Sequence, residues 1–393
     1  MNSEIPNEAI SNRSETIVEP VRYLPHETPQ LPEKGVALCL SGGGYRAMLF
    51  HAGALWRLNE LAFLPKLKRI SSVSGGSITA GVLAMNWHRL DFKDDIAQNF
   101  SAQVIAPIKK LASRTIDVPA VVFGTLLLRS AGNRIAASYR KYLFGNKTLQ
   151  DLPDEPRFVI NATNIQSGAL WRFSKLYMRD WRVGEIKNPK IDLATAVAAS
   201  SAFPPVLSPV RLKFNVSDFT PDDKIDLTDE RYRRDVVLTD GGVYDNLGLE
   251  TAWKNYETVL VSDAGAAFAA QIKPKRDWFR HTARILFIID NQVRNLRRRQ
   301  LVESYKQKIR RGAYWSIGAD LNADYKLKDT LPCPFGKTDL LAKVATRLKK
   351  LDTATQEKLI NWGYAVTDAA LRQYVDEKLP PPQSFPFDSV GIG

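Results

Sequence analysis

The first part of the chain alternates short apolar runs with turns of small residues and helical patterns. Residues 36–40 are continuously apolar, which is typical of a strand buried on both faces of a sheet. A second apolar run near 70–73 leads into a turn of small residues at 75–77, and residues 78–85 have a helix-compatible sequence. Because strand, turn and helix follow one another twice, the pattern predicts a parallel α/β arrangement.

The same alternation continues towards the C-terminus. Four more strands are expected, the first two as a hairpin: 158–162, 170–173, 235–239 and 258–262. Further helices are expected at 192–200, 278–312, 338–350 and 353–374. One segment inside this helical region, 285–289 (ILFII), also suits a short buried strand. The predicted fold is α/β, with a mostly parallel central sheet flanked by helices on both faces and a helical C-terminal extension.

Composition divides the chain into three segments. Residues 1–34 are polar and contain several prolines. They lack a basic region followed by an apolar core, so we interpret them as an extended N-terminal arm rather than a secretory signal. Residues 35–320 carry the main α/β pattern, and 321–393 are expected to be a helical extension of the same domain.

The charge balance indicates which kinds of partner to expect. The 393 residues carry a formal net charge of +13, which favours phospholipid surfaces, nucleotides or nucleic acid. The most apolar stretch, 118–128, is shorter than the about 20 residues that span a bilayer. It suits either a core helix over the sheet or a lid that dips into lipid.

Cysteine and histidine usage indicates the compartment and excludes some chemistry. Two cysteines, Cys39 and Cys333, cannot define a disulfide framework. Because Cys39 lies in a predicted buried strand, a reducing cytoplasm is the expected setting. Neither the cysteines nor the four histidines show metal-ligand spacing, so we expect no metal and no other cofactor.

Both strand-to-helix turns near the start of the chain contain residues suited to acyl transfer. In the first turn, Gly42, Gly43 and Gly44 permit unusual backbone conformations just before a helix, where amides favour negative charge. In the second, Ser77 follows two glycines in the pattern G-x-S-x-T, which is close to that of a nucleophile elbow. Acyl transfer needs a nucleophile and nearby backbone donors for an oxyanion, and these turns supply both.

Four motifs occur in an order that resembles the patatin-like phospholipase family. Residues 42–46 (GGGYR) resemble the glycine-rich oxyanion motif of that family, and 73–77 (VSGGS) resemble its nucleophile strand and turn. Residues 199–204 (ASSAFP) match a recurrent helix end, and 240–242 (DGG) match the catalytic D-G-G. The resemblance covers roughly residues 35–265, so 35–320 is expected to be a patatin-like catalytic domain.

The resemblance implies a serine hydrolase that cleaves acyl esters of membrane phospholipids through a Ser–Asp dyad. Ser77 would attack the ester, and Asp240 would act as general base in place of histidine. Asp240 ends a predicted strand, which places it at the same sheet edge as Ser77. Amides of residues 42–44 would hold the oxyanion, and Arg46 would support that turn or contact phosphate. Supporting roles fall to Gly75, Gly76, Gly241 and Gly242.

Two other functions are open from the residues alone. An α/β-hydrolase triad needs a histidine after the acid in chain order, and His281 is the histidine that follows Asp240. His51 lies in the first predicted helix, where we expect it to pack behind the glycine turn. The other alternative is a nucleotide-binding module with residues 42–44 around phosphate. Against it, the run is neither G-x-G-x-x-G nor followed by a Walker lysine.

Expectations on location and control follow from charge and from the resemblance. We expect a cytoplasmic enzyme that binds an anionic phospholipid surface peripherally when active, with no specific binding of nucleic acid. Basic residues gather at 294–311, which suits a solvated helix face or a site for an anionic ligand. Some bacterial patatin-like relatives are defence effectors switched on by cyclic nucleotides. The resemblance therefore implies a membrane-degrading antiviral effector, activated by a nucleotide-like anion or by homo-oligomerisation.

Overall fold

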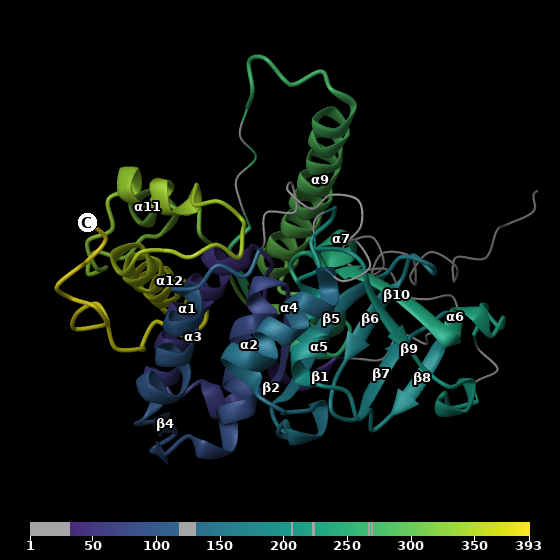
Figure 1. Ribbon diagram of the computed structural model, residues 1–393. Coiled ribbons are helices and arrows are strands. Elements are labelled where there is room, and N and C mark those ends of the chain that lie inside the picture. Colours follow the sequence, from purple (N-terminus) through teal and green to yellow (C-terminus); the bar gives the residue numbers. More distant parts are fainter. Residues whose placement is uncertain (1–31, 118–130, 206, 222–224, 266–267, 269) are drawn as a thin grey trace, which may run out of the picture.

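The computed structural model describes residues 32–117, 131–205, 207–221, 225–265, 268 and 270–393 (Figure 1). Within this part of the chain, a mixed ten-stranded sheet forms the centre of the molecule. A separate hairpin pairs β3 (Phe92–Lys93) with β4 (Ile96–Ala97). Helices cover the sheet on both faces, so the predicted fold class is confirmed.

Five neighbouring strands of the described sheet run parallel. In order across the sheet they are β12 (Arg311–Ser316), β11 (Tyr256–Asp263), β1 (Glu33–Leu40), β2 (Leu67–Val73) and β5 (Arg157–Asn164). Beyond β5 the pairing is antiparallel, through β6 (Leu170–Phe173), β7 (Tyr177–Asp180) and β8 (Gly184–Lys187). A short branch pairs β10 (Asp235–Asp240) with the last residues of β5 and with β9 (Val210–Lys213).

The continuous apolar run of β1 is explained by burial on both faces. Leu38 and Leu40 face the larger core, beneath α1 (Gly44–Glu60), α2 (Gly75–Asn86) and α5 (Leu193–Ser200). Ala37 and Cys39 face the opposite side and pack with α8 (Glu250–Trp253) and the second half of α9 (Trp278–Lys306). Successive strand residues point to opposite faces, so a strand covered on both sides is apolar at every position.

Shorter helices are α3 (Ala106–Ala112), α4 (Ala131–Tyr139), α6 (Arg231–Arg234), α7 (Gly242–Asp245), α10 (Leu321–Asp324) and α11 (Phe335–Ala342).

The C-terminal helix packs directly on the first helix. α12 (Thr353–Tyr374) has the predicted bounds and crosses α1 where two glycines allow close approach. A Cβ on Gly53 of α1 would overlap the carbonyl of Ile360, and one on Gly363 would overlap the carbonyl of Phe50. This contact fixes the C-terminal segment against the beginning of the chain. The predicted division at residue 320 is not tested by it and stays a prediction.

The structure corrects four expectations. The helix expected at 338–350 begins at Phe335 and ends at Ala342. Strand β10 is antiparallel to β5, so Asp240 reaches the sheet edge from the opposite direction to that expected. Residues 285–289 are helical, because α9 runs unbroken through them. α9 ends at Lys306, and residues 311–316 form strand β12 instead of continuing the helix. The N-terminal arm up to residue 31 and the apolar stretch 118–128 lie outside the described residues.

Candidate active site

The turn between β2 and α2 has the geometry of a nucleophile elbow, centred on Ser74. Ser74 follows the last residue of β2, and its backbone has φ 51° and ψ −118°, a conformation that non-glycine residues rarely adopt. The next two residues have no room for a side chain. A Cβ on Gly75 would overlap the carbonyl of Gly44, and one on Gly76 would overlap the carbonyl of Leu40. The two strand-to-helix turns are therefore packed against each other at Ser74.

Ser77, the predicted nucleophile, lies inside α2 and not at the turn. It belongs to the first turn of α2 and is fully buried. Its Oγ lies 3.0 Å from Oγ of Ser72 and 2.9 Å from Oγ of Ser200. Among the described residues, it makes no hydrogen bond to Asp240. The geometry therefore favours Ser74 over Ser77 as the nucleophile, because the Ser77 hydroxyl is already in hydrogen-bond contact with two other side chains.

Asp240 meets the elbow because β10 lies in line with β2 along the same side of β5. Val73 of β2 pairs with Asn161, and Asp240 of β10 pairs with Ala162, the next residue of β5. The carboxyl ends of the two strands therefore point at each other. The turn after Asp240 is equally close: a Cβ on Gly241 would overlap the carbonyl of Asn161.

The helix-end segment 200–202 joins the elbow to the Asp240 turn. Ser200 Oγ accepts a hydrogen bond from the backbone N–H of Ser74 (3.0 Å) and donates one to the carbonyl of Asn161 (2.6 Å). The N–H of Asp240 donates to the carbonyl of Ala202 (3.0 Å), and the N–H of Gly241 to that of Ser200 (3.2 Å). The helix expected to support the site thus contacts both turns directly, and Ser200 is a residue that the sequence-based prediction did not single out.

The carboxyl group of Asp240 is buried and has one oxygen without a donor. Its Oδ1 accepts a hydrogen bond from the N–H of Gly242 (2.7 Å). Its Oδ2 has no hydrogen-bond partner among the described residues. Burial raises the pKa of Asp240 to about 7, although the N–H of Gly242 and the Ser74 hydroxyl lower it, and the charge of Asp290 raises it further. Ser74 therefore lies close enough to interact with a carboxylate whose pKa is suited to proton transfer near neutral pH.

The glycine turn offers two backbone N–H groups beside the elbow. Gly43 and Gly44 have φ values of 144° and 61°, which side chains would strain. The N–H of Gly42 is used, because it donates to the carbonyl of Asn246 (3.1 Å). Those of Gly43 and Gly44 have no acceptor within the described part of the chain. Of the three predicted oxyanion donors, Gly43 and Gly44 are therefore available and Gly42 is not.

Arg46 and His51 hold the glycine turn from behind. The buried Arg46 guanidinium donates to the carbonyl of Ala264 (2.9 Å from Nη2) and to that of Val344. Burial, followed by the nearby charge of Arg294, lowers its pKa to about 10. His51 is also buried, with Nε2 2.9 Å from the carbonyl of Ser41, as expected for a residue behind the turn. Arg46 therefore supports the loop, which was one of its two predicted roles.

No described histidine completes a triad with Asp240. Burial lowers the pKa of His51 to about 4, so it is neutral, and its Nδ1 lies 2.8 Å from Oγ of Ser262. His88 lies in the short turn Trp87–Arg89 that follows α2. His281 is exposed at the start of α9, about two and a half turns before Asp290, the residue of that helix whose charge acts on Asp240. The geometry favours the dyad over the triad.

The basic residues of the predicted stretch 294–311 make separate contacts with different parts of the protein. Several of its cations are within ion-pair distance of carboxylates: Arg297 with Asp245 and Glu250, Lys306 with Glu303, and Arg311 with Glu257. Arg310 stacks over the ring of Trp253, 4.7 Å from its centroid. These contacts account for much of the stretch as structural.

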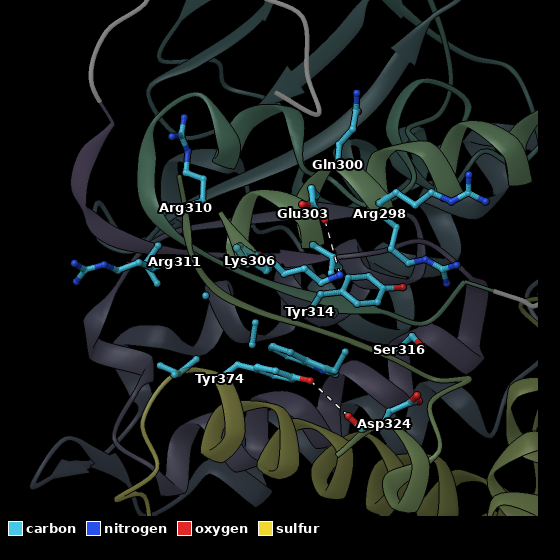
Figure 2. A pocket seen from close by; sticks show the side chains of 18 of the residues that line it. Arg298, Gln300, Glu303, Lys306, Arg310, Arg311, Tyr314, Ser316, Asp324 and Tyr374 are labelled. Atoms are coloured by element: carbon cyan, nitrogen blue, oxygen red, sulfur yellow. Dashed lines mark hydrogen bonds and ion pairs between the residues drawn. The ribbon is translucent and has the colours of Figure 1, made fainter. Parts of the chain in front are cut away.

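An open groove of about 1510 Å³ lies beside this stretch, between the second half of α9, strand β12 and the end of α12 (Figure 2). Figure 2 shows Arg298, Arg310 and Arg311 pointing in different directions rather than towards one point. Neither Ser74 nor Asp240 lines the groove. The predicted site for an anionic activator therefore stays a prediction.

No group of three or more His, Cys, Asp or Glu side chains in the described ranges is arranged to hold a metal ion. None of the described helices combines the length and the apolar composition needed to cross a bilayer.

Comparisons with known proteins identify the family and support the fold. Residues 38–253 match the family of patatin-like phospholipases. A search of curated proteins finds no match. Among solved structures, human GIVD cytosolic phospholipase A2 has a TM-score of 0.51 at 12% identity, over 84% of this chain and 60% of that chain. This chain thus spans less than two thirds of that enzyme, and the likeness supports the fold.

Two bacterial structures were also matched with lower TM-scores. VipD from Legionella pneumophila has a TM-score of 0.34 at 16% identity, over 86% of this chain and 66% of that chain. The ExoU–SpcU complex of Pseudomonas aeruginosa has a TM-score of 0.23 at 16% identity, over 69% and 52%.

Proposed function

Since the chain belongs to the patatin-like phospholipase family, we propose that it is a serine acyl hydrolase that cleaves acyl esters of phospholipids. In this proposal Ser74 is the nucleophile and Asp240 is its general base. The single observation that carries it is the meeting of the strained Ser74 elbow with a buried carboxylate whose Oδ2 has no donor among the described residues. Ser77, through its contacts with Ser72 and Ser200, has a supporting role.

The first chemical step forms an acyl-enzyme. Asp240 accepts the hydroxyl proton of Ser74 at Oδ2 while Ser74 Oγ attacks the ester carbonyl carbon. The N–H groups of Gly43 and Gly44 stabilise the negative charge that develops on the carbonyl oxygen. When the tetrahedral intermediate collapses, the bond to the alcohol breaks, and Asp240 gives the proton to the departing lysophospholipid oxygen.

The second step releases the fatty acid. Asp240 takes a proton from a water molecule, whose oxygen attacks the acyl carbonyl carbon. The bond between that carbon and Ser74 Oγ then breaks, and the proton returns to Ser74. Because one carboxyl group acts as base and acid in turn, a pKa near 7 serves both roles better than the ordinary value of an aspartate.

The proposal extends to membrane association and control. Peripheral binding of a cytoplasmic enzyme to an anionic membrane is supported by the net charge of +13. Activation by a nucleotide-like anion or by self-assembly, and a role as a membrane-degrading antiviral effector, are predictions that rest on the resemblance to the family. Hydrolysis by the purified protein, with and without a panel of cyclic di- and trinucleotides and across protein concentrations, tests the two forms of control. High activity that no nucleotide and no dilution changes would contradict both forms of control.

The proposed reaction is tested on phospholipid vesicles with mass spectrometry of the products. The purified protein is expected to release fatty acid and lysophospholipid, and S74A to release none. The matched variant S77A removes a neighbouring hydroxyl from the same helix start and is expected to retain activity. Absence of both products with wild-type protein, under basal and nucleotide-supplemented conditions, would contradict the proposed activity. Loss of activity in S77A together with normal activity in S74A would contradict the assignment of the nucleophile.

A further inference from the structure

The first half of α9 exposes apolar side chains on all sides of the helix. Residues 285–289 (ILFII) are five consecutive apolar residues, and each is at least 42% exposed. Since a helix has 3.6 residues per turn, five in a row point in every direction around it. A helix that is apolar all round is normally buried in protein or in lipid. Figure 1 shows this half of α9 extending beyond the sheet and the helices that cover it.

This apolar surface adjoins the segment that binds the Asp240 turn. The ring of Phe287 stacks on that of Phe203, with centroids 6.0 Å apart and an interplanar angle of 19°. Phe203 directly follows Ala202, whose carbonyl accepts the N–H of Asp240. One turn after Phe287, Asp290 is close enough for its charge to raise the pKa of Asp240. The exposed part of α9 is therefore joined, through Phe287 and Phe203, to the segment that binds the Asp240 turn.

Basic and aromatic side chains surround the outer end of the same helix. Lys273, Lys275 and Arg276 are exposed in the segment that leads into α9. Trp278, its first residue, is 81% exposed. Tryptophan beside aliphatic side chains, with lysine and arginine next to them, is the composition of elements that lie in a membrane interface. The positive charges complement an anionic headgroup layer, and the apolar side chains complement the acyl region beneath it.

We propose that the first half of α9, with the basic segment 273–276, is the surface by which the protein docks on an anionic phospholipid bilayer. The inference rests on the proposed function, because docking here brings a phospholipid to Ser74 and Asp240. The apolar side chains of 285–289 enter the interface, and the basic segment contacts headgroup phosphates. The acyl chain then reaches the site past Phe287 and Phe203.

Charge favours a bilayer over a second copy of the chain as the occupant of this surface. In a two-fold symmetric pair each copy presents the same patch to the other. Two copies joined around the outer end of α9 would bring basic segments 273–276 together and place like charges side by side. An anionic bilayer instead neutralises these charges.

The test compares exposed leucines in two places. Leu286 of α9 is 59% exposed and Leu340 of α11 is 62% exposed, so L286D and L340D make the same change at similarly exposed positions. Binding is measured by sedimentation with phosphatidylcholine vesicles, with and without phosphatidylglycerol. We expect L286D to lower binding and vesicle hydrolysis about tenfold or more, because a charge is strongly unfavourable in the interface. L340D should match wild type in both, and both variants should hydrolyse a water-soluble short-chain ester normally.

A second pair of variants tests the role of charge. K273Q/K275Q removes two positive charges next to α9, and K349Q/K350Q removes two exposed charges before α12. The first pair should lose most of the preference for phosphatidylglycerol vesicles at low salt, while the second should lose less. The difference should disappear at high salt, where screening shortens the range of the interaction.

The outcomes separate the docking surface from the proposed activity. Unchanged vesicle binding by L286D would overturn the docking proposal while normal hydrolysis by wild type leaves the activity in place. If L286D binds vesicles as wild type does but forms a smaller oligomer than wild type, measured by light scattering, the surface would be assigned to a second copy of the chain instead. If wild type hydrolyses neither substrate, with or without the cyclic nucleotides, the proposed activity fails, and the binding measurements still decide the docking surface. Thermal unfolding at the wild-type temperature would confirm that L286D folds normally.

Discussion

Ser74 and Asp240 meet from opposite directions along one side of β5. Ser74 follows Val73, which pairs with Asn161, whereas Asp240 pairs with Ala162, the next residue of the same strand. The shared neighbour fixes the two turns relative to each other without a histidine between them. Ser200, which binds the backbone of Ser74 and of Gly241, holds the arrangement from a third side.

Activity should depend on the ionisation of Asp240. Because burial raises the pKa of Asp240 to about 7, kcat/KM should rise with pH through about 7 and level off above it. D240N cannot accept the proton of Ser74 and is expected to lose about 10² to 10⁴ of the rate, the usual contribution of a general base. H281A removes the histidine required by a triad and should retain wild-type rates and the same profile. A large loss in H281A with a small one in D240N would support the triad instead.

D240N should also stabilise the folded protein at high pH. The pKa of Asp240 is higher in the folded chain than its ordinary value of 3.8, so the folded state binds the proton more tightly than the unfolded state. The stabilisation that this proton provides is fully present below pH 3.8 and is lost as the pH rises through about 7. D240N has no such loss, so its thermal unfolding temperature should exceed that of wild type at pH 8 more than at pH 5. An advantage that is larger at pH 5 would contradict the assigned direction of the pKa shift.

Ser200 should affect the rate by positioning the elbow. S200A removes the acceptor of the Ser74 N–H, and a buried N–H left without a partner costs about 1–3 kcal/mol. Because the misplaced nucleophile reacts more slowly, kcat should fall up to about 10²-fold while KM changes little. The neighbouring variant S201A removes a hydroxyl that binds the Val197 carbonyl and Tyr139, and it should leave kcat nearly unchanged. Equal losses in the two variants would show that only the general stability of this segment matters.

Gly75 should tolerate no side chain. In G75A the new Cβ would overlap the carbonyl of Gly44, so the elbow and the glycine turn must separate. Overpacking of this kind typically costs about 1–3 kcal/mol of stability. The separation should also reduce kcat, because the oxyanion donors move away from Ser74. Gly336 in α11 has open space around the position of a Cβ, and G336A should match wild type in unfolding temperature and kcat. A fully active G75A would contradict the close contact between the two turns.

Local features of the fold could be predicted from the sequence, and features set by partners far along the chain could not. The strands at 36–40 and 258–262 were expected because a strand buried on both faces is apolar at every position. The direction of β10 has no local signal, since the same residues suit a parallel or an antiparallel neighbour. β12 was missed because its sequence, RGAYWS, is not a continuous apolar run. The ILFII segment has the sequence of a buried strand, but it lies within an unbroken helix and its side chains are exposed.

The nucleophile, too, could not be identified from the local sequence motif alone. The windows 72–76 (SVSGG) and 75–79 (GGSIT) each depart from G-x-S-x-G at one position, so the motif alone does not separate Ser74 from Ser77. What separates them is where the strand ends: β2 stops at Val73, so Ser74 lies at the turn and Ser77 lies inside the helix. The apolar run was also expected to end at Val73, but the turn was expected at residues 75–77, so Ser74, the residue that directly follows the strand, was passed over.

The assignment of Ser74 as the nucleophile is tested most directly by mapping the site of covalent labelling by a fluorophosphonate, which reacts with activated serines. The labelled protein is digested with trypsin, and the peptide from Ile70 to Arg89, which contains both serines, is fragmented in the mass spectrometer. Fragments that break between Gly75 and Gly76 separate the two positions. The adduct is expected on Ser74, with no labelling in S74A and with wild-type labelling in S77A. An adduct on Ser77, or labelling that persists in S74A, would contradict the assignment.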